Sequence, residues 1–175
     1  MIKKMIKKNL FKNNTHMGLR AQAIVEFAIV LPILIMILVG LLEVGRLIFI
    51  YSAATNGSRE AARYGSAVGL GDDGLHKYNN CAGIREVAKS SAYLLNLPDA
   101  NIAISYDHGP GTGSPFVVCD AVSGEDADVV VSSGDRVLVT VTAPYSPMVK
   151  LIPITPRTFV LESARTIFGI VELDP

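Results

Sequence analysis

Residues 27–42 read FAIVLPILIMILVGLL, a run of sixteen residues without a charge. Glu26 precedes the run and Glu43 follows it. With the weakly polar residues on both sides, the segment has about 30 residues, which corresponds to about 45 Å of α-helix. A bilayer core needs only about 20 residues. The sequence therefore predicts a transmembrane helix, which we assign to residues 22–50.

Charge is distributed unevenly around this run. The chain as a whole has no net charge, but residues 1–20 carry six basic residues and no acidic ones. Basic flanks of membrane helices stay on the cytoplasmic side. We therefore expect residues 1–21 to be a basic cytoplasmic leader and residues 51–175 to form an extracytoplasmic domain, in a single-pass protein of the cytoplasmic membrane. A nucleic-acid-binding arm is disfavoured because only Phe11 supplies an aromatic ring, so no nucleic-acid partner is expected.

Two other interpretations of the apolar run compete with a membrane anchor. A cleaved secretory signal peptide has a shorter apolar region and a small-residue cleavage site, whereas only a weak match occurs here, near Tyr51. A buried helix of a soluble domain is the second alternative. Pro32 does not decide between them, since membrane helices tolerate proline when neighbouring groups satisfy the freed carbonyl.

The acidic residues at the two ends of the run differ in their surroundings. Glu43 and Arg46 are three residues apart, so an ion pair within the helix is predicted. Glu26 has no such partner, since Arg20 is six residues away on a different face of the helix. Charged groups at membrane depth usually have a partner. Either Glu26 lies in water at the cytoplasmic interface, or it meets a positive group on another chain.

The segment from Arg20 to Ser66 resembles the N-terminal signature of TadE-like proteins, pseudopilins of the tight-adherence (Tad/Flp) pilus system. The resemblance covers about 45 residues and depends on their order and spacing. The matching positions are Gln22, Ala23, Val25, Glu26, Phe27, Leu31, Pro32, Glu43, Gly45, Arg46, Glu60, Ala61, Ala62, Arg63 and Tyr64. Residues 135–169 are similar more loosely.

The resemblance implies a pilus-assembly function and its partners. A prepilin-type peptidase would cut between Ala21 and Gln22, although these leaders usually have glycine where this chain has Ala21. Glu26 would then be the fifth residue of the mature protein and would meet the new N-terminal ammonium, within its own chain or on a neighbour. Glu26 and Phe27 are thus the predicted assembly residues. The implied partners are other pilin or pseudopilin subunits, Tad assembly proteins and the membrane.

The outer part of the chain predicts an α+β domain. We expect the long helix to continue to Gly65 and a short amphipathic helix to cover residues 82–95, with Arg85 on its polar side. Strands are expected at residues 101–106, 116–122, 128–131, 135–142 and 157–168. The four prolines within residues 144–156 exclude a central strand there. Together these elements predict two helices against an antiparallel sheet, which is also the general shape of pilin-like subunits.

The sequence predicts a disulfide bond and no active site. Cys81 and Cys119 both follow the apolar run, so in an oxidising compartment we expect them to pair. Asp107 and His108 are interpreted as an exposed loop dipeptide. Residues 69–74 match G-x-G-x-x-G only formally, because no buried strand precedes them and two aspartates would repel a phosphate. Neither an enzyme, a cofactor nor a metal site is predicted.

Three hypotheses remain. The first is a membrane-anchored pseudopilin or minor subunit that takes part in the assembly of a Tad-type (Flp) type IV pilus, and hence in cell adhesion. The second is a signal-anchored extracytoplasmic binding module unrelated to pili. The third is an exported enzyme whose site the sequence does not reveal. Cleavage at Ala21 separates the first from the other two.

Overall fold

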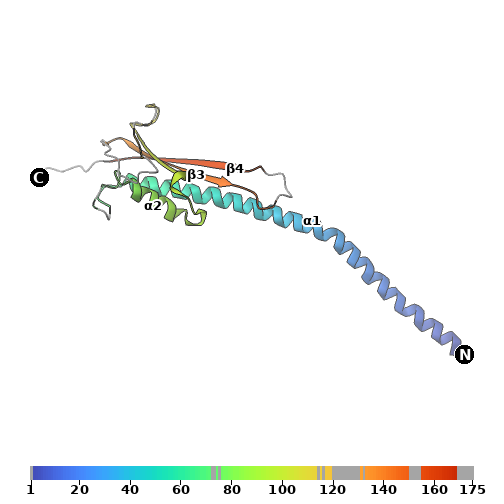
Figure 1. The fold of residues 1–175 in the computed structure, drawn as a ribbon. Helices are drawn as coiled ribbons and strands as arrows, with labels where there is room; N and C mark the ends of the chain where they lie inside the picture. The colour runs from blue at the N-terminus through green and yellow to red at the C-terminus, as the bar shows by residue number, and fades with distance from the viewer. Residues whose placement is uncertain are drawn as a thin grey trace. The chain divides into compact units, whose positions relative to one another are not determined.

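The chain divides into two units, Met1–Val44 and Gly45–Pro175, and each is described by itself. The computed structural model describes residues 2–71, 74, 76–113, 115, 117–119, 131, 133–149 and 155–168, with the backbone alone for residues 2–21, 117 and 119. Helix α1 (Ile2–Gly65) forms the described part of the first unit and continues into the second (Figure 1). Pro32 lies inside this helix and does not end it. The helix ends at Gly65, as predicted.

The second unit is α+β, which confirms the predicted fold class. Four antiparallel strands form one sheet in the order β2-β1-β3-β4, and α2 lies beside the last turns of α1 (Figure 1). The elements after α1 are α2 (Cys81–Ser91), η1 (Tyr93–Leu95), η2 (Asp99–Asn101), β1 (Ile102–Asp107), β2 (Val117–Cys119), β3 (Arg136–Tyr145) and β4 (Arg157–Thr166).

The core lies between one face of the sheet and the two helices. Alternate residues of β1 and β3 point to this face and are fully buried, as the period of two in a strand requires. Burial of each such valine or isoleucine contributes about 1.5–3 kcal/mol before opposing terms. These residues are Ile102, Ile104, Tyr106, Val137, Val139, Val141, Ala143 and Tyr145.

Small residues let α1 approach α2 closely. Ala54, Ala61 and Ala62 of α1 are buried in the core. A Cβ atom on Gly57 would lie 3.0 Å from the Ala88 carbonyl oxygen of α2, closer than ordinary van der Waals contact. Alanine and glycine on this stripe therefore set the distance between the helices.

Helix α2 begins at a capping asparagine. The Asn80 side chain accepts a hydrogen bond from the Gly83 N–H. This satisfies one of the amide groups that a helix start leaves without an intrahelical partner. The helix ends in η1, and Asn96 then takes the left-handed conformation (φ 45°). The predicted helix over 82–95 is thus an α-helix followed by a 3₁₀ turn.

Three predictions about local structure need correction. Arg85 is buried rather than on a polar face, because it lies four residues after Cys81 and three before Ala88, on the core stripe. The described end of the predicted strand 128–131, Val131, is not in a strand, and residues 128–130 lie outside the described residues.

The third correction concerns Pro144, which lies inside β3. Strand β1 pairs with β3 only as far as Val141, whereas β4 pairs with β3 to Tyr145. The last residues of β3 therefore have one neighbouring strand, and a missing N–H on the other side removes no ladder hydrogen bond.

Candidate membrane anchor and assembly surface

The apolar run of α1 presents its side chains outward. The large apolar side chains from Ile24 to Leu42 that are exposed have between 48% and 73% of their surface accessible. This is the one helix in the described part of the chain that is long and apolar enough to cross a membrane. A core helix of a soluble domain would bury such a surface. The exposure therefore favours a membrane anchor over the buried-helix alternative.

The predicted processing and assembly residues lie on this helix without a break in its backbone. Ala21 and Gln22 are both helical, and the side chain of Ala21 is outside the described residues. Phe27 is 62% exposed and Glu26 is also exposed. Within the described part of the chain, no hydrogen bond or ion pair engages the Glu26 carboxylate. The pairing of Glu26 with a positive group stays a prediction.

Arg46 contacts the loop that follows β3. Its Nη1 donates a hydrogen bond of 2.8 Å to the Ser146 carbonyl oxygen, and its guanidinium lies 5.6 Å from the ring centre of Tyr145. The second contact is within the range of a cation–π interaction. These contacts hold residues 145–146 against α1, while the predicted pairing of Arg46 with Glu43 stays a prediction.

Cys81 belongs to α2, which packs on the core face of the sheet, and Cys119 belongs to β2, which pairs with β1. Cys81 opens α2 and is 1% exposed, and no free thiol occurs among the described side chains. Cys119 ends β2 opposite Ile104 of β1, but its own side chain lies outside the described residues. The placement is compatible with the predicted disulfide without testing it.

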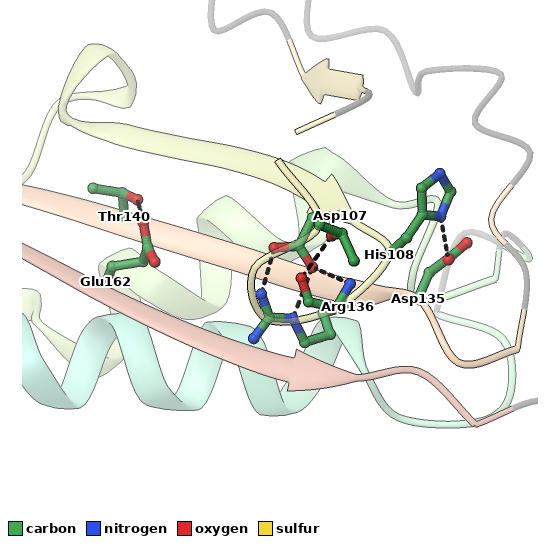
Figure 2. Close-up of polar contacts among 8 residues, drawn as sticks. Asp107, His108, Asp135, Arg136, Thr140 and Glu162 are labelled. Carbon is green, nitrogen blue, oxygen red and sulfur yellow. Dashed lines mark hydrogen bonds and ion pairs between the residues drawn. The ribbon is translucent and has the colours of Figure 1, made fainter. Parts of the chain in front are cut away.

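A cluster of hydrogen-bonded polar side chains lies in the second unit where β1 ends and β3 begins (Figure 2). Arg136 donates two hydrogen bonds to the Asp107 carboxylate, with Nε 2.7 Å from Oδ1. Asp107 Oδ1 also accepts the Gly109 N–H at 3.1 Å. His108 Nδ1 lies 2.7 Å from the Asp135 carboxylate. Asp107 is thus a buried, paired residue, and its interpretation as part of an exposed dipeptide was wrong.

The ion pair between Asp107 and Arg136 shifts the pKa values of both groups. The hydrogen bonds from Arg136 hold the pKa of the Asp107 carboxyl below its usual range, although burial acts in the opposite direction. The same pair raises the pKa of the Arg136 guanidinium. Bidentate pairs of this kind are strong and directional. They fasten the start of β3 to the end of β1.

The contact between His108 and Asp135 orients the imidazole ring. No group of three metal-ligating side chains occurs in the part of the chain that the structure describes. Arg136 could not be predicted as the partner of Asp107 from local sequence, because only the pairing of β1 with β3 places the two residues opposite each other.

Comparison with protein families identifies the anchor segment. The model of the family described as TadE-like protein matches residues 21–63. These residues are similar to TadE-like proteins. The matched segment contains the predicted processing and assembly residues together with the exposed apolar run. No curated protein and no solved structure matches the chain.

Proposed function

We propose that this protein is a membrane-anchored pseudopilin or minor subunit that takes part in assembly of a Tad-type (Flp) pilus. The observation that carries the proposal is the coincidence of the TadE-like match with an exposed apolar helix. Residues 1–21 would remain in the cytoplasm, and the second unit would lie outside the cytoplasmic membrane, because the basic residues precede the apolar run of α1. The activity is one of protein packing, with no enzymatic step.

Glu26 supplies the specific interaction in this proposal. A peptidase cut between Ala21 and Gln22 creates an ammonium group four residues before Glu26. Four residues correspond to about one helical turn, so the ammonium of the same chain or of a neighbour can reach the carboxylate. One such pair in a low-dielectric medium adds little net stability but can fix the register of packed helices. The exposed ring of Phe27 would pack against the same neighbour.

The second unit supplies the partner contacts outside the membrane. Its core is closed by α1, α2 and the sheet, and a Cys81–Cys119 disulfide would fasten α2 to β2. The partners are other pilin or pseudopilin subunits and Tad assembly proteins. Neither nucleic acid nor a cofactor enters this function.

The first test is N-terminal sequencing of the protein recovered from membranes of its own host. A mature protein that starts at Gln22 supports the proposal. A start beyond about Ala53 means an ordinary secreted protein and refutes it. A start at Met1 rejects the processed-subunit mechanism and leaves a membrane-anchored relative.

The second test asks whether assembly needs the Glu26 carboxylate itself or any acidic residue of the chain. Glu26→Ala should abolish pilus assembly and leave membrane insertion unchanged. Glu86→Ala is the matched control, because Glu86 is exposed on α2 and lies outside the TadE-like segment. Normal assembly by the Glu26→Ala variant would remove Glu26 from the mechanism.

A further inference from the structure

Strand β4 lies at one edge of the sheet. It pairs with β3 along its whole length, and no other strand in the described part of the chain pairs with it. We call the side of β4 that faces away from β3 the outer edge. Along such an edge every second backbone N–H and C=O points away from the sheet. A ten-residue edge strand therefore offers a template on which another strand can form hydrogen bonds.

Two observations show which residues of β4 direct their backbone to the outer edge. The Ile167 N–H donates a hydrogen bond to the Asp135 carbonyl oxygen, so the backbone of Ile167 faces β3. Pro144 of β3, which has no N–H, lies opposite Thr158, as expected where no hydrogen bond joins a pair. Because the backbone direction alternates along a strand, the residues that face the outer edge are Thr158, Val160, Glu162 and Ala164.

Apolar side chains remain partly uncovered beside the outer edge. Phe159 and Leu161 of β4 pack against the core without being buried. The ring of Phe159 contacts Tyr51 of α1 edge-on, with 5.8 Å between the ring centres. Tyr51 is 48% exposed and Ile48 of α1 is 59% exposed. A strand added to β4 would cover part of this apolar surface.

Helix α1 extends beneath the outer edge on its side away from α2. Gly57 faces Ala88 of α2, and Ser58 shares a hydrogen bond with Ser163 of β4. Each residue turns an α-helix by about 100°, so Arg59 lies beyond Ser58, on the side opposite to Gly57. Ile48 precedes Arg59 by roughly three helical turns and therefore lies on the same side of α1.

The exposed charges on this side of β4 are basic. Arg157 and Arg165 lie on the face of β4 that is turned toward α1, at the two ends of the strand, and both are exposed. Arg59 of α1 is exposed as well. The acidic residue of β4, Glu162, lies on the opposite face, where it contacts Thr140. Opposite charges on facing strands attract each other, so an incoming strand with acidic ends fits this surface.

The same charges disfavour a second copy of β4 as the occupant. Residues that face each other across two strands lie on the same side of the sheet. Two antiparallel registers then overlap the strands most fully. One places Arg157 opposite Arg165 of the other copy, and the other places Glu162 opposite the Glu162 of that copy. Like charges directly opposite each other destabilise the pairing.

We propose that the outer edge of β4 is a docking site for a β-strand of a different subunit, which has apolar residues at its centre and acidic residues at its ends on the side facing α1. The inference deepens the proposed function and rests on it, because the strand would belong to one of the partner subunits. Main-chain hydrogen bonds to β4 would supply affinity, and contacts with Tyr51, Phe159 and the arginines would supply specificity.

The test measures binding of labelled peptides to the purified full chain in a non-ionic detergent by fluorescence anisotropy. The acidic probe has nine residues, with glutamate at both ends, valine at the third, fifth and seventh positions, and threonine at the remaining ones. The basic probe differs only in having lysine at both ends. Wild-type affinity for the acidic probe should be about tenfold higher than for the basic probe.

Two variants of Val160 separate the backbone from the side chain. Val160→Pro removes an N–H of the outer edge and should weaken binding of the acidic probe by about tenfold. Val160→Ala is the matched control, because it retains the N–H and loses only a side chain that is 64% exposed. Its affinity should stay close to that of the wild type. Proline is tolerated on an outward-facing edge position, so both variants should keep the Tm of the wild type.

A charge-reversed variant keeps the inference falsifiable even if Val160→Pro fails to fold. Arg59→Glu combined with Arg165→Glu should reverse the preference, so that the basic probe binds more tightly than the acidic one. Equal affinity of the wild type for both probes, or unchanged binding by folded Val160→Pro, overturns the inference. A wild-type dimer that Val160→Pro converts to a monomer also overturns it, because a second copy then occupies the edge. Absent probe binding in a protein that starts at Gln22 rejects strand docking and leaves the proposed function in place.

Discussion

Replacement of Gly57 by valine tests how α1 and α2 are held together. A Cβ atom at this position would lie 3.0 Å from the Ala88 carbonyl oxygen and 3.1 Å from the Ala92 Cβ. Neither atom is the flexible end of a long side chain, so the helices must move apart. Overpacking of this kind costs about 1–3 kcal/mol, and the two further methyl groups of valine add to it. Valine recovers only a few tenths of a kcal/mol through its better helix propensity.

The expected net effect is a loss of about 2–4 kcal/mol in the free energy of unfolding of the second unit. For a domain of this size that loss lowers Tm by roughly 10 °C. The measurement is thermal unfolding of the full chain in detergent, followed by near-UV circular dichroism of the buried tyrosines. Gly45→Val is the matched control, because nothing lies within 4 Å of a Cβ atom at Gly45.

A second substitution assigns the effect to the contact itself. Ala92→Gly removes the methyl group nearest to the new side chain, so it should restore part of the stability that Gly57→Val loses. Contacting residues typically show coupling of about 0.5–3 kcal/mol in such double-mutant cycles. Wild-type melting of Gly57→Val, or equal damage from Gly45→Val, would refute the argument from close helix packing.

Two further predictions concern polar and covalent links in the second unit. Because Arg136 lowers the pKa of Asp107, their pair stabilises the folded state above the unfolded carboxyl pKa near 3.8 and loses this effect as the pH falls through the folded value. Arg136→Ala should therefore be less stable than wild type in urea at pH 7, by a gap that shrinks below about pH 4, whereas His108→Ala should change stability little. Reduction of a Cys81–Cys119 disulfide, which closes a loop of about 38 residues, should cost about 4 kcal/mol; an unchanged mass after alkylation without reductant and a lower Tm with reductant would establish it.

The sequence was most informative where one physical requirement dominates. The uncharged run 27–42 has few alternatives to a membrane-length helix, and Gly65 ended that helix as predicted. The alternating valines of residues 135–142 identified the buried face of β3. In these segments the local pattern and the tertiary environment agree, so the pattern alone was sufficient.

The sequence was least informative where a neighbour decides the outcome. Pro144 is tolerated in β3 only because the pairing of β1 with β3 stops at Val141. The sequence around Pro144 does not show where β1 ends. Asp107 became a buried ion pair because the sheet places Arg136 opposite it. Arg85 lay on the core stripe by spacing, but its charge suggested the opposite face. The processing and assembly residues Ala21 to Phe27 act on other molecules, so the fold of this chain does not test them.

The way in which α1 enters the second unit has a mechanical consequence. Ala54, Ala61 and Ala62 make the helix itself one wall of the core, and Ser58 of the same helix shares a 3.0 Å hydrogen bond with Ser163 of β4. A pull along α1 therefore loads this interface in shear, and many contacts must fail together before the helix slides. A domain attached through a loop could instead be peeled from its anchor one contact at a time. A force applied along α1 is therefore transmitted to the whole second unit.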